Sequence, residues 1–181
     1  MRSKEEILDI VCDLYEELNI SSLGFDLPSV IKSLGINLIP YSSYDKSEQK
    51  ILVDFDQDGF NLINPKNSKI EIYYNDLIAP HNRIKFTLPH ELGHICLGHN
   101  CDLGGETKEK KNEADLFSNE LYCPQAFMIV YGLKTVSDLI STFDITDTYA
   151  AILLDKLSKR MDMNLTKNEK RLIEIFERNK K

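Results

Sequence analysis

The sequence predicts an α+β protein with a small antiparallel sheet, a central helix, and further helices before and after them. Short apolar runs separated by Gly, Pro and Asn lie between residues 36 and 74, which is the pattern of short strands joined by turns. Apolar residues repeat with a period near 3.6 over residues 4–18 and over most of the chain after residue 86, which is the pattern of amphipathic helices.

The first half of the chain supplies two helices and the sheet. Residues 4–18 place their apolar side chains on one stripe, and a second helix follows, capped by Asp26 or Ser29 and stopped at Gly35. A strand is predicted at 36–41, followed by a polar stretch at 42–50. The three expected strands of an antiparallel meander are Ile51–Phe55, Phe60–Ile63 and Lys69–Tyr74.

The second half is predicted to be helical. A helix at 111–122, ended by Pro124, follows a polar loop at 103–112. The expected C-terminal helices are 127–131, 136–143, 146–160 and 166–178, the last with a Thr166/Glu169 capping box. We divide the chain into residues 1–131, which contain the sheet, and a C-terminal helical segment, 132–181, packed on them.

Composition narrows the class of protein. The chain has 181 residues, 42% hydrophobic and 28% charged, which suits one globular domain. Its net charge of −7 argues against nonspecific nucleic-acid binding by the whole surface. The start of the chain lacks the apolar core of a signal peptide, and no stretch has the length of a membrane span. We therefore expect a cytoplasmic protein with no membrane partner.

The four cysteines form no Cys-x-x-Cys pair. They stand at positions 12, 96, 101 and 123. In a cytoplasmic chain they are expected to be reduced thiols, largely buried. Cys96 and Cys101 lie near the central helix, but neither has a spacing that joins its histidines.

Residues 86–99 contain the candidate metal-binding and catalytic residues. They contain one complete His-Glu-x-x-His, at His90, Glu91 and His94. On a helix, residues four apart project from one face, so both imidazoles can reach a single cation. Glu91 lies one position round, where it misses the metal but can act as general base on a water beside it. Pro89 implies either a kink or a helix that begins near Leu88, with Thr87 as N-cap.

A catalytic zinc needs a third protein ligand and keeps one position open. His81 is distant in sequence, and His99 would be turned away on a continuing helix. Glu113 is the preferred candidate, because the apolar residues that follow it would hold its helix against the core and complete a two-His, one-Glu site. The competing acids are Glu109 and Glu120.

These motifs resemble a known family. The run Phe-Thr-Leu-Pro-His-Glu-Leu-Gly-His at 86–94, followed by Glu-Ala-Asp-x-Phe-Ser-x-Glu-Leu-x-x-Pro at 113–124, is similar to the paired motifs of the ImmA/IrrE family of bacterial zinc metallopeptidases. The clear resemblance covers roughly residues 25–125. The departures are Pro89 and Ser118, where the family usually has alanine, and Tyr122 and Cys123 before the final proline.

The resemblance implies a zincin-like metallopeptidase core and a zinc-dependent endopeptidase. Such an enzyme would cleave a helix-turn-helix repressor of a mobile element or a stress response. Carried over to this chain, the Zn²⁺ ligands would be His90, His94 and Glu113, and the general base would be Glu91. The group that stabilises the oxyanion stays open among Tyr122, His81 and His99.

Two further expectations concern partners. An edge of the sheet beside the metal would hold an extended segment of a protein substrate by main-chain hydrogen bonds. Direct nucleic-acid binding is not expected, because the helical pair at 135–159 is acidic where a DNA-reading motif would be basic. The alternative function is a non-hydrolytic partner-binding module or toxin–antitoxin component with a metallopeptidase-like fold.

Overall fold

The computed structural model describes residues 1–99 and 107–181 and has an α+β fold, as the sequence predicts. The strands are β1 (Asn37–Pro40), β2 (Gly59–Ile63) and β3 (Ile70–Tyr74). The helices are α1 (Lys4–Glu17), α2 (Leu27–Ser33), α3 (Lys46–Phe55), α4 (Ile84–Cys96), α5 (Lys108–Tyr122), α6 (Gln125–Val130), α7 (Val136–Phe143), α8 (Asp147–Ser158) and α9 (Lys167–Asn179). Short 3₁₀ turns are η1 (Tyr41–Ser43) and η2 (His81–Arg83).

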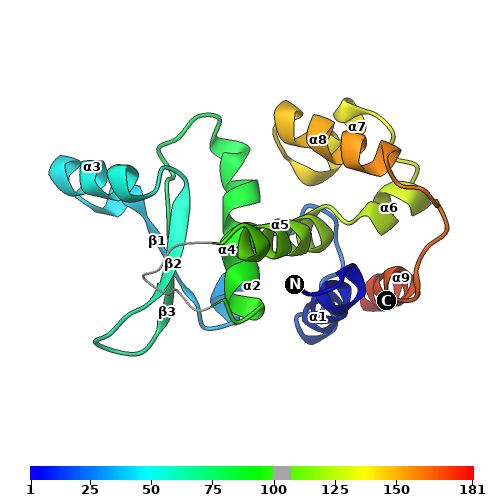
Figure 1. Cartoon of the computed structure of the whole chain (residues 1–181), viewed down its shortest axis with the longest axis horizontal. Coiled ribbons are helices and arrows are strands. Elements are labelled where there is room, and N and C mark those ends of the chain that lie inside the picture. The colour runs from blue at the N-terminus through cyan, green and yellow to red at the C-terminus, as the bar shows by residue number, and fades with distance from the viewer. Residues whose placement is uncertain (100–106) are drawn as a thin grey trace.

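The sheet is mixed and not the predicted antiparallel meander. Its order is β1-β3-β2, with β1 parallel to β3 and β2 antiparallel to it. The predicted strands at 36–41, 60–63 and 69–74 are present with shifted ends. In Figure 1 the sheet stands on one side of α4, and α1, α9 and the C-terminal helices stand on the other.

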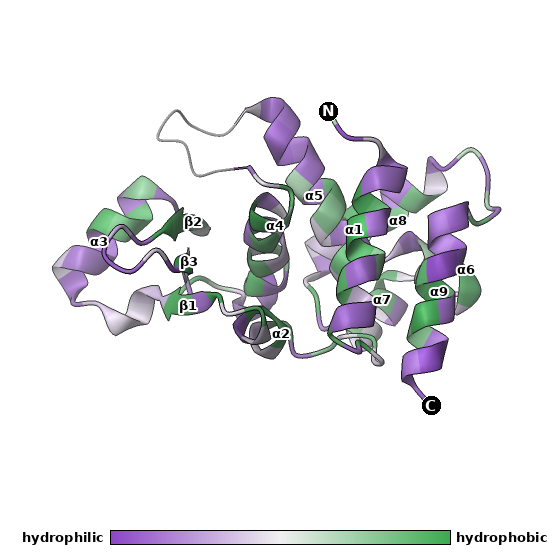
Figure 2. Cartoon of the chain, turned by 90° about the horizontal axis from the view of Figure 1, so that it is seen from below, coloured by the Kyte–Doolittle hydropathy of each residue, from purple (hydrophilic) through white to green (hydrophobic). Residues whose placement is uncertain are grey.

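The predicted strand at 51–55 is wrong, because these residues form the second half of α3. Asp45 accepts hydrogen bonds from the amides of Ser47 and Glu48, and the Glu48 carboxylate returns one to the amide of Asp45. This capping box starts a helix. The helix buries no residue, so its apolar side chains, such as Ile51 and Phe55, are exposed. Figure 2 shows hydrophobic stretches, in green, along α3. A short apolar run alone does not distinguish a strand from a helix.

Helix α4 begins at Ile84 and runs through Pro89, so of the two alternatives the start near Leu88 is wrong. Proline has no N–H to donate to the carbonyl of Lys85, and this costs the helix one internal hydrogen bond. Burial offsets the loss: Leu88 and Leu92 are at most 1% exposed and belong to the hydrophobic core. Tertiary packing, more than local propensity, therefore holds this helix together.

Gly93 allows α5 to cross α4 closely. A Cβ atom at position 93 would lie 3.0 Å from Cδ1 of Phe117 and 3.2 Å from the Cα and carbonyl oxygen of Ala114. Two of these three contacts are to backbone, which cannot rotate away. Glu113 and Asp115 therefore flank the crossing point on either side of Ala114.

We expect Gly93→Val to destabilise the fold by about 2 kcal/mol, because the added methyl groups overpack the contact between α4 and α5. Gly93→Ala should cost less, since better helix propensity offsets part of the strain. Urea unfolding followed by circular dichroism measures both. Ala151→Val, on the exposed face of α8, is the control for β-branching. Equal losses at positions 93 and 151 would contradict close packing at Gly93.

The core joins the two ends of the chain. Helix α9 packs along α1. The ring centroids of Tyr15, Phe127 and Phe176 lie 4.6 to 6.4 Å from one another. The Tyr15 hydroxyl donates to the carbonyl of Leu121 at 2.9 Å, which fixes α1 to α5. The segments 1–131 and 132–181 thus share one hydrophobic cluster.

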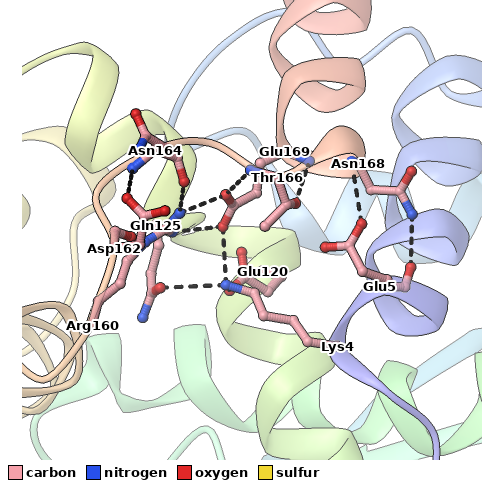
Figure 3. Close-up of polar contacts among 10 residues, drawn as sticks. All are labelled: Lys4, Glu5, Glu120, Gln125, Arg160, Asp162, Asn164, Thr166, Asn168 and Glu169. Atoms are coloured by element: carbon pink, nitrogen blue, oxygen red, sulfur yellow. Dashed lines mark hydrogen bonds and ion pairs between the residues drawn. The ribbon is translucent and has the colours of Figure 1, made fainter.

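A buried ionic network connects the same helices (Figure 3). Glu169 on α9 is 0% exposed, and its carboxylate contacts Arg160 at 2.7 and 2.8 Å and Lys4 at 3.0 Å. Nζ of Lys4 also lies 3.0 Å from Oε1 of Glu120 on α5. Lys4 therefore joins the start of α1 to both α5 and α9.

The predicted C-terminal helices are present, and Thr166 and Glu169 form the predicted capping box. The predicted loop at 103–112 is corrected in part: α5 already begins at Lys108, capped by Thr107, and residues 103–106 lie outside the described residues. Within the described ranges, no helix combines the length and apolar character needed to cross a bilayer.

Candidate metal centre

Helix α4 brings the two motif histidines together. Nε2 of His90 lies 3.1 Å from Nε2 of His94. Two nitrogens bound to one tetrahedral zinc at its usual bond length stand about 3.4 Å apart. Both side chains are buried, at 9% and 8% exposure. The two Nε2 atoms of the predicted pair are therefore about as far apart as two nitrogens bound to one divalent cation.

The carboxylate of Asp115 lies close to the other nitrogen of the His90 ring. Its Oδ1 lies 2.8 Å from Nδ1 of His90. A carboxylate at this position favours the tautomer with the proton on Nδ1, which leaves the Nε2 lone pair available to a metal. Asp115 was assigned no role from sequence. Its position two residues beyond Glu113, in the same motif, was the available signal.

Glu113 is buried on α5, where its carboxylate contacts Arg2 and His99. Its Oε1 accepts from the backbone N–H of Arg2 at 2.5 Å, and its Oε2 accepts from the Arg2 guanidinium at 2.8 Å. Nε2 of His99 lies 3.0 Å from the same Oε2. His99 thus stands between Glu113 and His94. Among residues 1–99 and 107–181, no three His, Cys, Asp or Glu side chains form a group able to hold a metal.

The contacts of Glu113 keep it ionised. Burial by itself would raise the pKa of its carboxyl group, but hydrogen bonds from the Arg2 backbone, the Arg2 side chain and His99 lower that pKa to about 2. A charged carboxylate is the form that binds a divalent cation.

His99 lies beside His94, because the helix expected to turn it away does not continue as far as residue 99. Helix α4 ends at Cys96, and Gly98 adopts a left-handed conformation with φ 65°. The amide of His99 then bonds to the carbonyl of His94 at 2.9 Å, and that of Gly98 to Ile95 at 3.1 Å. This Schellman motif folds the chain back, so Nδ1 of His99 lies 3.1 Å from Nδ1 of His94. Gly98 was the sequence signal.

Glu91 faces the sheet. Its Oε2 accepts a hydrogen bond from Nδ2 of Asn61 on β2 at 2.7 Å. The strand order makes β2 an edge of the three-stranded sheet, so the expected edge beside the site is β2. A small open pocket adjoins it, lined by Asn61, Ile63, Ile70, His94, Ile95, Gly98 and His99. Asn61 was missed from sequence because nothing local to it indicates the contact.

The remaining candidates lie elsewhere. Glu109 is exposed, and Glu120 is buried against Lys4. Tyr122 is 1% exposed in the core, where its ring packs edge-on against Phe25. His81 is exposed in η2. Of the three candidates for oxyanion stabilisation, only His99 contacts the histidine pair.

The cysteines take no part in the described site. Cys12, Cys96 and Cys123 are free thiols, and burial raises the pKa of Cys96 to about 11, which disfavours the metal-binding thiolate. Cys101 lies outside the described residues.

Comparison with known proteins gives no relative. No protein-family model matches the chain, and no curated protein is similar to it at a significant level.

Proposed function

We propose that the protein is a zinc-dependent endopeptidase with a zincin-like core, related in mechanism to the ImmA/IrrE metallopeptidases that its motifs resemble. The observation that carries the proposal is the convergence of His90 and His94, with Nε2 atoms 3.1 Å apart, beside a glutamate that faces an edge strand. A metal-free histidine cluster used only for packing has no need of Glu91 at that edge.

The chain's own groups have distinct roles in this proposal. Zinc bound at His90, His94 and Glu113 would supply Lewis-acid polarisation of a carbonyl and a more acidic water. Glu91 accepts the proton of the attacking water and returns it to the leaving amine. Asn61 holds one oxygen of Glu91 by its amide N–H, which keeps the carboxylate turned toward the edge strand. The charge of Asp115, close to Nδ1 of His90, favours the ring tautomer with the proton on that nitrogen.

The proposed substrate is a cytoplasmic helix-turn-helix repressor of a mobile element or stress response. This assignment rests on the family resemblance. The arrangement of the site supports a polypeptide substrate, because β2 is an edge strand and Asn61 on that strand contacts Glu91. An extended segment added along β2 would run past the general base.

Cleavage of the partner tests the function. The zinc-loaded protein, incubated with helix-turn-helix repressors from the same genome, should produce one discrete cut in one of them, located by mass spectrometry. Chelation should stop the reaction and added zinc should restore it, because the metal supplies the electrophile. His94→Ala should bind no zinc and cut nothing. An intact partner in the presence of the zinc-loaded protein would contradict the proposal.

A second function, partner binding without hydrolysis, is favoured by one observation: Glu113 is hydrogen-bonded to Arg2 and His99, not to the histidine pair. In that case the two proteins would form a complex whose affinity does not change on chelation. Gel filtration with and without chelator separates the two functions.

A further inference from the structure

We propose that His99 is the positioning residue of His94. It accepts a hydrogen bond from Nδ1 of His94 and so leaves the lone pair on Nε2 of that ring for the metal, while Glu113 sets the tautomer of His99 in turn. The inference rests on the proposed function, because it takes a metal at His90 and His94. It requires no contact between that metal and Glu113.

The carboxylate of Glu113 accepts hydrogen bonds on both of its oxygens. The backbone N–H of Arg2 donates to Oε1 at 2.5 Å, and Nη1 of Arg2 donates to Oε2 at 2.8 Å. Nε2 of His99 lies 3.0 Å from the same Oε2. Because an ionised carboxylate is an acceptor only, Nε2 of His99 is the donor in this contact. Nη1 of Arg2 also lies 3.4 Å from that nitrogen, but the longer distance makes this the weaker contact.

The tautomer of His99 determines the tautomer of His94. A neutral imidazole carries its proton on one of its two nitrogens and a lone pair on the other. With the proton on Nε2, Nδ1 of His99 has the lone pair. Nδ1 of His94 lies 3.1 Å from it, so His94 donates in this hydrogen bond, and its own lone pair is on Nε2. Both residues are only 8% exposed, so water competes little for these nitrogens.

Helix α5 thus supplies one carboxylate to each histidine of the motif. Asp115 acts directly, because its Oδ1 lies 2.8 Å from Nδ1 of His90 and favours the proton there. Glu113 acts on His94 through His99. Both Nε2 atoms then carry lone pairs, 3.1 Å apart, which repel each other unless a cation binds to both. Partners that fix the tautomer of a metal-binding histidine in this way strengthen metal binding.

NMR reads the tautomers directly. Long-range correlations between ring protons and ring nitrogens distinguish the two neutral forms of histidine. At mildly alkaline pH, His99 should be protonated on Nε2 in both zinc-free and zinc-loaded protein, and His94 should be protonated on Nδ1 in the zinc-loaded protein. The chain has four histidines, and His99→Asn identifies the signals of residue 99. A His99 ring protonated on Nδ1, or on both nitrogens, would overturn the inference.

Zinc affinity measures the effect of the hydrogen bond. His99→Phe keeps a ring but cannot accept from His94, and it should bind zinc about 10- to 100-fold more weakly, as is usual when the partner of a metal ligand is lost. The amide oxygen of His99→Asn stands near the place of Nδ1, so this variant should recover part of the loss. His81→Phe makes the same change at an exposed site in η2 and is the matched control. Competition with a chromogenic chelator gives the dissociation constants.

The outcomes separate this inference from the proposed function. If His94→Ala binds zinc as tightly as wild type, the metal centre is wrong, and the role of His99 is wrong with it. If His94→Ala loses zinc while His99→Phe binds it like wild type, the centre stands and the positioning role fails. Thermal unfolding of each metal-free variant checks that it is folded, and the NMR measurement on wild type needs no variant to be stable.

Discussion

Replacing Glu91 with glutamine should lower the cleavage rate on the order of 10³-fold, because the general base is lost, while zinc binding changes little. Glutamine has the shape of glutamate, and its amide oxygen can still accept the hydrogen bond that Asn61 gives to Glu91. It cannot accept the proton of the attacking water. Single-turnover cleavage of the repressor and chelator competition measure the two effects on the same protein.

Glu109→Gln is the matched control for Glu91→Gln. It makes the same chemical change on an exposed acid of α5, and it should leave the cleavage rate as in wild type. If Glu91→Gln keeps full biological output although Glu91 faces the site, proteolysis is not the function, and the partner-binding alternative takes its place.

Glu169→Ala should destabilise the fold by about 3 kcal/mol, because the largely buried Arg160 loses its counter-charge and Lys4 loses one of its two. The carboxylate receives hydrogen bonds from Arg160, from Lys4 and from the backbone of Thr166 at distances of 2.7 to 3.0 Å. Removing it leaves Arg160, whose side chain is only 12% exposed, without its partner. Urea unfolding at pH 7 measures the loss. Glu174→Ala, an exposed acid on the same helix, should cost far less.

The ionisation of Glu169 makes the free energy of unfolding depend on pH in the acid range. Burial would raise its pKa, but Arg160, Thr166 and Lys4 lower it to about 2, from 4.5 in an ordinary glutamate. A carboxyl whose pKa is lower in the folded protein contributes stability above its unfolded pKa and loses it as pH falls. The difference in unfolding free energy between wild type and Glu169→Ala should therefore be constant above pH 4.5 and shrink between pH 4.5 and 2. A difference that does not change over this range would contradict the ionic role.

The features that a short stretch of sequence determines, such as a shared helix face or a helix start, were predictable. The His-Glu-x-x-His spacing fixes which side chains share a helix face, so His90 and His94 were predictable from four residues of separation. The Thr166/Glu169 capping box likewise fixed the start of α9. The apolar run at 51–55 fits a strand as well as a helix because periodicity is ambiguous over five residues, and the signal that distinguishes them is the capping box at Asp45.

The contacts that complete the site were beyond such reasoning. Arg2 and Glu113 are 111 positions apart, and Asn61 and Glu91 are 30 apart. Their meeting depends on how α1 and β2 dock against α4 and α5, which no short pattern records. The position of His99 lies between these two extremes of predictability. Its return toward His94 depends on one left-handed glycine, Gly98, which is a local signal for a helix end.

The ion pairs of Lys4 couple the last helix, α9, to the start of α1. Lys4 contacts Glu169 on α9 as well as Glu120 on α5, so the position of the start of α1 depends on a residue 165 positions away. A substitution in α9 that removes the carboxylate of Glu169 would therefore loosen the first turn of α1, although the two segments lie at opposite ends of the sequence.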